Sequence, residues 1–130
     1  MPTQNDSVPT MGDGAATGLT VRLRPARGRA VVLAFEGDLD IETLGRARPA
    51  LDETIAGHPS TLVVDLGAVG FCDSSGLNLL LKARMAAVAA DIRLRLAAPS
   101  SAVSRLLELT GADSVFAVHP SVDAALADDR

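Results

Sequence analysis

Alternating and continuous apolar runs predict the strands of this chain. Leucine and valine alternate with threonine and arginine over residues 19–24, and leucine and isoleucine alternate with arginine over 92–96. Strict alternation is typical of a strand with one buried face. Residues 30–35 and 61–66 are almost continuously apolar, which favours central strands buried on both faces. A short run at 114–118 predicts a last strand.

Helical spacing of apolar residues predicts a first helix after Gly37-Asp38-Leu39-Asp40. Asp40 is the favoured N-cap because an inward stripe then follows it. Pro49 falls inside the pattern and predicts a local bend, and Gly57-His58-Pro59 ends the helix. The expected inward stripe consists of Ile41, Leu44, Ala47, Leu51 and Ile55.

Three more helices are predicted, one starting after Phe71-Cys72-Asp73, one at Pro99-Ser100-Ser101 and one at Pro120-Ser121. Gly111 stops the middle one of these. Their expected inward residues are Leu77, Leu80, Leu81, Met85 and Val88 in the first, and Val103, Leu106, Leu107 and Leu109 in the next.

Strands and helices alternate after an initial antiparallel hairpin turned by residues 25–28. This order predicts an α/β fold: a mixed sheet of about four to five strands packed with about four helices. One domain is expected over residues 19–127. Residues 1–18 mix Pro, Thr, Asn, Asp, Gly and Ala without a period, so we expect a disordered tail there.

Composition narrows the possible partners. The net charge is −4, and aromatic residues make up 2% of the chain with no Trp or Tyr, which argues against modules that stack nucleic-acid bases. The single cysteine permits no internal disulfide. The polar first residues do not resemble a secretory signal, and the apolar region 77–90 is too short and too charged to span a bilayer. We expect a soluble cytoplasmic protein.

Catalytic motifs are weak in this sequence. The local string Gly70-Phe71-Cys72-Asp73-Ser74-Ser75-Gly76 lacks the Gly-x-Ser-x-Gly elbow of serine hydrolases, and no phosphate-binding glycine loop occurs. His58 and His119 both fall in predicted turns, and they have no Glu at metal-ligand spacing. Neither an enzyme, nor a metal site, nor a bound cofactor is therefore expected.

Cys72 can be interpreted in two ways. A thiol near a helix N-terminus can have a lowered pKa and react. Alternatively, the side chain is a small buried hydrophobe that fills space behind the turn, and this is the interpretation that we favour.

The junction over residues 71–77 is the candidate functional stretch. A strand ends before it, in a predicted turn that contains Gly67 and Gly70, and a helix begins within it. Asp73 or Ser74 could simply cap that helix, and Gly76 would allow close backbone approach. Alternatively, a hydroxyl there could be phosphorylated, because a helix N-terminus tolerates an anion. The residues alone leave both possibilities open.

The same residues resemble the STAS-domain anti-sigma-factor antagonists of bacteria. The resemblance rests on the turn at 37–40, on Val64-Asp65-Leu66, on Phe71 to Leu77 and on the third helical segment, residues 98–111, in the right order. It covers about residues 19–126. The long tail and Pro49 depart from the family's pattern, but the Asp-Ser-Ser-Gly string is intact.

The resemblance implies partner switching. The unphosphorylated protein would bind an anti-sigma factor that is also a serine kinase, and so release a sigma factor. The kinase would phosphorylate Ser74 and end the binding, and a separate serine phosphatase would reverse the change. Asp73, Ser75 and Gly76 would support the acceptor, and Gly37, Asp38 and Asp40 would join the docking surface. ATP and a divalent metal would belong to the kinase.

Two other functions stay open at this point. STAS domains also serve in ligand sensing and in transport-associated systems, so this chain could be such a subunit without a phosphorylation switch. A serine hydrolase is the remaining alternative, and loss of ester turnover in a Ser74→Ala variant would favour it.

Overall fold

A computed structural model describes residues 18–127, which form five strands, four α-helices and one short 3-10 turn. The predicted tail at 1–18 lies outside the described residues except for Gly18. Along the chain the elements are β2 (Leu19–Pro25), β3 (Ala30–Leu39), α1 (Leu44–Ala56), β4 (Thr61–Cys72), α2 (Ser74–Ala89), β5 (Arg93–Ala97), α3 (Ser101–Thr110), β6 (Ala117–His119) and α4 (Val122–Ala127).

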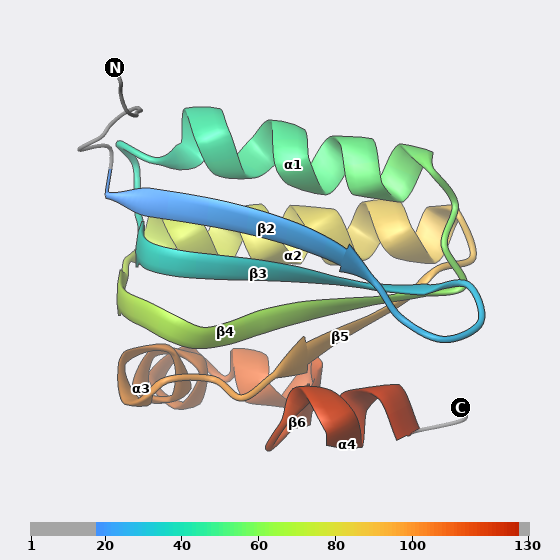
Figure 1. The fold of residues 1–130 in the computed structure, drawn as a ribbon. Coiled ribbons are helices and arrows are strands. Elements are labelled where there is room, and N and C mark those ends of the chain that lie inside the picture. Colours follow the sequence, from blue (N-terminus) through green and yellow to red (C-terminus); the bar gives the residue numbers. More distant parts are fainter. Residues whose placement is uncertain (1–17, 128–130) are drawn as a thin grey trace.

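The strands form one sheet in the order β2-β3-β4-β5-β6 (Figure 1). β2 and β3 are antiparallel, as the predicted hairpin requires, and the pairs β3–β4, β4–β5 and β5–β6 are parallel. The predicted mixed α/β fold is therefore confirmed. Because β3 to β6 run in the same direction, the helices that follow β3 and β4 both begin at the carboxyl edge of the sheet.

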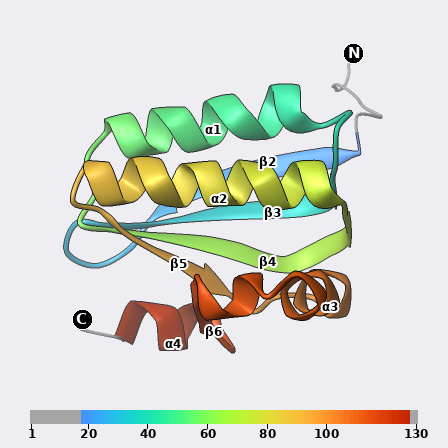
Figure 2. The same cartoon turned by 180° about the vertical axis from the view of Figure 1, so that it is seen from behind.

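Helices α1 and α2 lie side by side over one face of the sheet (Figures 1 and 2). Successive strand residues point to opposite faces, so each central strand contributes to two clusters. The larger cluster joins α1 and α2 to Leu33, Val64 and Leu96. The smaller one joins Ala125 of α4 to the residues that alternate with these, Val32, Val63 and Ala97.

β3 and β4 run further than the sequence predicted. The predicted turn at Gly67 and Gly70 is wrong, because β4 continues through both glycines to Cys72. It stays paired with β3 as far as Leu39, through register shifts after Ala34 and after Gly37. The irregular pairing with β3 accommodates Gly67 and Gly70, so the strand does not end at either glycine.

The predicted start of the first helix is also wrong. α1 begins at Leu44, with Thr43 at the N-cap position, and not after Asp40. Ile41 therefore lies before the helix and is 64% exposed instead of inward. The helix continues through Pro49 as one element and ends at Gly57 as expected.

Three other residues that were expected inward point to solvent. Met85 and Val88 of α2 are 68% and 62% exposed, and Leu109 of α3 is 77% exposed. In α2 the small residues Ala83 and Ala87 are buried instead. These alanines share the buried face of α2 with Leu77, Leu79 and Leu80, and their small side chains let the second half of the helix pack closely, so Met85 and Val88 are left on the opposite face.

The C-terminal helices and strand follow one another in the predicted order, but their first and last residues differ from the prediction. Gly111 ends α3 in a left-handed conformation, with φ of 76°, as its position predicted. The strand expected at 114–118 starts later, because residues 112–114 form a 3-10 turn and β6 covers only Ala117–His119.

Candidate functional site

The start of α2 is capped by Asp73. β4 ends at Cys72, and Asp73 takes an extended backbone conformation before the helix begins at Ser74. Its Oδ1 accepts a hydrogen bond from the Gly76 backbone N–H at 3.0 Å. Its carbonyl oxygen accepts the first helical bond, from the Leu77 N–H. Of the two caps that the sequence allowed, the structure therefore uses Asp73.

Ser74 occupies the first helical position and its side chain is exposed. Within residues 18–127 its hydroxyl makes no hydrogen bond. Ser75 is half-buried by comparison. Ser74 is thus the more accessible of the two hydroxyls, and it lies at the positive end of the α2 dipole.

Gly76 lets the first turn of α2 sit directly on the end of β3. A Cβ at this position would collide with the Leu39 carbonyl oxygen, and it would lie 3.0 Å from both Cys72 Sγ and Leu39 Cγ. The Asp73 N–H also donates to the Leu39 carbonyl, at 3.3 Å. The close approach that the sequence expected of Gly76 is therefore present.

The 37–40 segment lies beside this turn because β3 and β4 pair to their ends. Asp38 is opposite Phe71, and Leu39 is opposite Cys72. Gly37 has a φ of +119°, and an added Cβ would collide with the Gly18 carbonyl. The structure thus brings together the two segments that carry all of the candidate residues.

Asp40 and Thr43 bind each other reciprocally. Asp40 Oδ1 accepts from the backbone N–H groups of Glu42 and Thr43, at 3.0 and 3.2 Å. Thr43 Oγ1 accepts from the Asp40 N–H and donates to the Asp38 carbonyl, both at 3.0 Å. The carboxylate therefore caps the turn before α1 and not the helix itself. Thr43 was not among the predicted site residues, although its spacing of three from Asp40 resembles a capping box.

Carboxylates and exposed apolar side chains both lie near Ser74 in these two segments. Burial raises the pKa of the Cys72 thiol to about 11, and the nearby carboxylates of Asp73 and Asp40 add to the rise. The thiol stays protonated at neutral pH, which agrees with a packing role and not with a reactive one. Ile41 and Phe71, on the same two segments, are 64% and 51% exposed.

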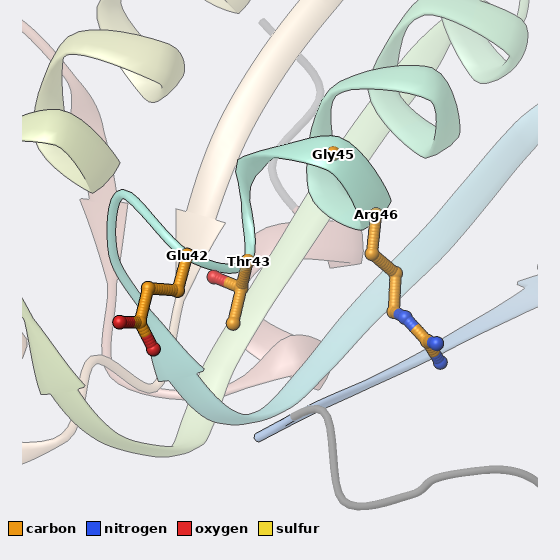
Figure 3. A pocket seen from close by; sticks show the side chains of 4 residues that line it. All are labelled: Glu42, Thr43, Gly45 and Arg46. Atoms are coloured by element: carbon orange, nitrogen blue, oxygen red, sulfur yellow. The ribbon is translucent and has the colours of Figure 1, made fainter.

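A shallow hollow of about 450 Å³ lies at the start of α1, lined by Glu42, Thr43, Gly45 and Arg46. Figure 3 shows that the charged ends of Glu42 and Arg46 point away from each other. A small-molecule site normally has apolar walls and polar groups that converge. This hollow therefore does not resemble a cofactor pocket.

The described residues offer little for catalysis. His58 precedes the first residue of β4, and His119 is the last residue of β6. Because these strands are parallel, the two histidines lie at opposite strand ends of the sheet, His58 at the amino ends and His119 at the carboxyl ends. Over residues 18–127 no three His, Cys, Asp or Glu side chains are grouped in a way that could hold a metal ion. In the same range no helix has the length and apolar character needed to cross a membrane.

The family model and the similar proteins of known sequence indicate the same family. The model of the STAS domain matches residues 23–125. Anti-sigma-F factor antagonist RsfB of Mycobacterium tuberculosis is 31% identical over 112 residues, which cover 86% of this chain and 90% of that protein.

Solved structures of similar fold include an anti-sigma factor antagonist from Mycobacterium paratuberculosis. Its TM-score is 0.76 at 28% identity, with 86% of this chain and 94% of that one covered. The anti-sigma factor antagonist SpoIIAA, in its unphosphorylated form, has a TM-score of 0.69 at 22% identity, with 82% and 93% covered. The second likeness shows the fold alone.

Proposed function

The chain belongs to the STAS domain family, and we propose that it is an anti-sigma-factor antagonist whose partner binding is switched off by phosphorylation of Ser74. The names of its relatives support the antagonist role. A protein of this kind is a regulatory binding protein and not an enzyme. The cytoplasm, where sigma factors act, is the proposed location.

One observation carries the choice of Ser74. The cap of α2 is the Asp73 side chain, while the Ser74 hydroxyl is exposed and makes no hydrogen bond within the described residues. A structural cap must use its oxygen to bind a backbone N–H, and Ser74 does not. The hydroxyl is therefore available to a kinase without loss of any contact that holds the helix.

A phosphate would change the surface without unfolding the domain. It adds a charge of about −1.5 to −2 at neutral pH, and the free N–H groups and dipole at the start of α2 accommodate such an anion. Asp73 and Asp40, whose charges both act on Cys72, lie close to that position. Phosphorylation would concentrate negative charge there and repel an acidic partner surface.

The proposed docking surface combines both segments of the site. Ile41 and Phe71 supply exposed apolar contacts. Asp38 is exposed and supplies charge, while Asp40 fixes the turn before α1. Gly76 allows the close contact with Leu39 that holds the two segments together, and Gly37 allows a close backbone contact with Gly18. The proposed partners are an anti-sigma factor with serine kinase activity and a serine phosphatase, and the kinase supplies ATP and its metal.

The test is phosphorylation by the purified anti-sigma kinase of the same organism, with the modified residue mapped by mass spectrometry. Wild type and Ser75→Ala should both accept phosphate at Ser74, and Ser74→Ala should not be modified. Phosphate on Ser74→Ala at the wild-type level would show that the site is wrong. Binding of the anti-sigma factor in the same samples tests the antagonist role separately.

A further inference from the structure

We propose that the docking surface of the anti-sigma factor extends from Ser74 along the outward face of α2, over an apolar stripe formed by Leu81, Met85 and Val88. The inference rests on the proposed function, because it takes the protein that recognises Ser74 as the occupant of the stripe. It adds a second contact region, one that phosphorylation does not touch.

The stripe is in register with the acceptor. Ser74, Asn78, Leu81, Met85 and Val88 follow one another at intervals of four and three residues, the spacing of neighbours on one helix face. Met85 and Val88 are 68% and 62% exposed, Asn78 is exposed, and Leu81 is half-buried and packs in part against the core. The buried residues of α2, including Leu80, Ala83 and Ala87, lie on the opposite side of the helix.

Charge is sparse on this face of α2. Between Ser74 and Ala89 the charged residues are Lys82, which is exposed, and Arg84, which is half-buried, while Ala86 and Ala89 add exposed apolar surface. The neighbouring helix α1 differs, because its exposed positions include Arg46, Arg48, Asp52 and Glu53. The two helices lie side by side in one layer (Figure 2), and their exposed residues make two different surfaces. α1 presents the charged surface expected to face water, and α2 presents the surface expected of a contact.

The dimensions suit a single partner. A rise of about 1.5 Å per residue places Val88 about 21 Å along the helix from Ser74. A standard interface buries about 800 Å² on each side, which corresponds to a patch about 32 Å across. A patch of that size centred on Ser74 reaches about 16 Å along α2, as far as Met85. The larger interfaces common in signal-transduction assemblies, about 2,000–5,000 Å² in total, extend to Val88 as well. Met85 suits such a contact, since its flexible thioether side chain adapts to the opposing surface.

The experiment compares Met85→Glu and Val88→Glu with the matched control Leu109→Glu. Leu109 is also an exposed apolar residue of a helix, at 77%, but it lies on α3. The probe is the purified anti-sigma factor of the source organism that binds the wild-type chain most tightly. We expect Met85→Glu to weaken this binding about tenfold or more and Val88→Glu by a smaller factor, because a charge would be desolvated in the interface. Leu109→Glu should bind like wild type.

The outcomes distinguish a failure of the proposed stripe on α2 from a failure of the proposed function. If wild type binds and Met85→Glu binds equally well, the stripe is not part of the interface and the inference is overturned, while the proposed function stands. If wild type binds no anti-sigma factor, the proposed function fails and the inference fails with it. If the wild type sediments as a dimer that Met85→Glu dissociates, with unchanged anti-sigma affinity, the occupant is a second copy of the chain and the inference is wrong. Unchanged melting temperatures would show that lost binding is not unfolding.

Discussion

Helices α1 and α2 begin at the same edge of the sheet, yet their first turns are built differently. Each follows a parallel strand, and each has an aspartate just before it, Asp40 or Asp73. At α2 the carboxylate of Asp73 binds the helix directly, through the Gly76 N–H. At α1 the carboxylate of Asp40 binds the preceding turn, and the N-cap residue Thr43 makes no side-chain capping bond.

The two hydroxyls at these starts differ accordingly. The Thr43 hydroxyl accepts from the Asp40 N–H and donates to the Asp38 carbonyl, and its residue is 4% exposed. The Ser74 hydroxyl is exposed and makes no hydrogen bond within residues 18–127. The Thr43 hydroxyl therefore stabilises the turn before α1, whereas the Ser74 hydroxyl is accessible from solvent. The comparison teaches that the serine at the start of α2 keeps an exposed hydroxyl because its neighbour, Asp73, does the capping.

The first prediction uses the glycines of the two first turns, and it has the largest expected effect. Gly76→Ala should lower the free energy of unfolding by about 3 kcal/mol, because its Cβ would collide with the Leu39 carbonyl. Gly45→Ala at the start of α1 meets no atom within 4 Å and should be neutral or stabilising by about 0.5 kcal/mol. Chemical denaturation of both variants measures the difference. Equal stabilities would contradict the close approach of α2 to β3.

The second prediction removes the structural hydroxyl. Thr43→Val keeps the shape of the side chain but leaves the Asp40 N–H without its acceptor, so the free energy of unfolding should fall by about 2 kcal/mol. Thermal unfolding followed by circular dichroism provides the measurement. A loss below about 0.5 kcal/mol would mean that the hydroxyl is not structural.

The third prediction removes the α2 cap. Asp73→Ala should cost about 1 kcal/mol of stability, the usual value of an N-cap. Asp52→Ala, at an exposed position within α1, is the matched control and should change stability by less than about 0.5 kcal/mol. If the two aspartate variants lose the same amount in urea titrations, Asp73 does not act as a cap.

The smallest effect is expected at Ser74, the proposed phosphoacceptor. Ser74→Ala should change the free energy of unfolding by less than about 0.5 kcal/mol, because the hydroxyl holds no hydrogen bond in the described structure. The same denaturation measurement applies. A loss close to that of Asp73→Ala would mean that Ser74 shares in capping, and the contrast with Thr43 would weaken.

The sequence predicted the order of elements and the sheet type, but not all of the bounds. Gly67 and Gly70 look like a turn in sequence, whereas pairing with β3 keeps β4 extended to Cys72. Met85 and Val88 fit a helical stripe, yet α2 turns Ala83 and Ala87 inward. Periodicity finds an apolar face, but close packing decides which of two neighbouring stripes is buried.

The candidate site was predictable in part. The motif located Asp73, Ser74 and Gly76, and the structure decided which of the first two is the cap. The role of Thr43 depends on a reciprocal bond with Asp40, which becomes visible only once the turn is built. The contact between Gly76 and Leu39 joins residues far apart in sequence, so no local pattern could reveal it.

The most direct test of the account is the affinity of the anti-sigma factor for the chain before and after stoichiometric phosphorylation. The two forms would be compared by isothermal titration calorimetry at the same ionic strength, with phosphate mapped to Ser74 in the modified sample. We predict that the unphosphorylated chain binds and that phosphorylation weakens binding by about a hundredfold, as adding like charge to a docking surface should. Equal affinity of the two forms would contradict the switch.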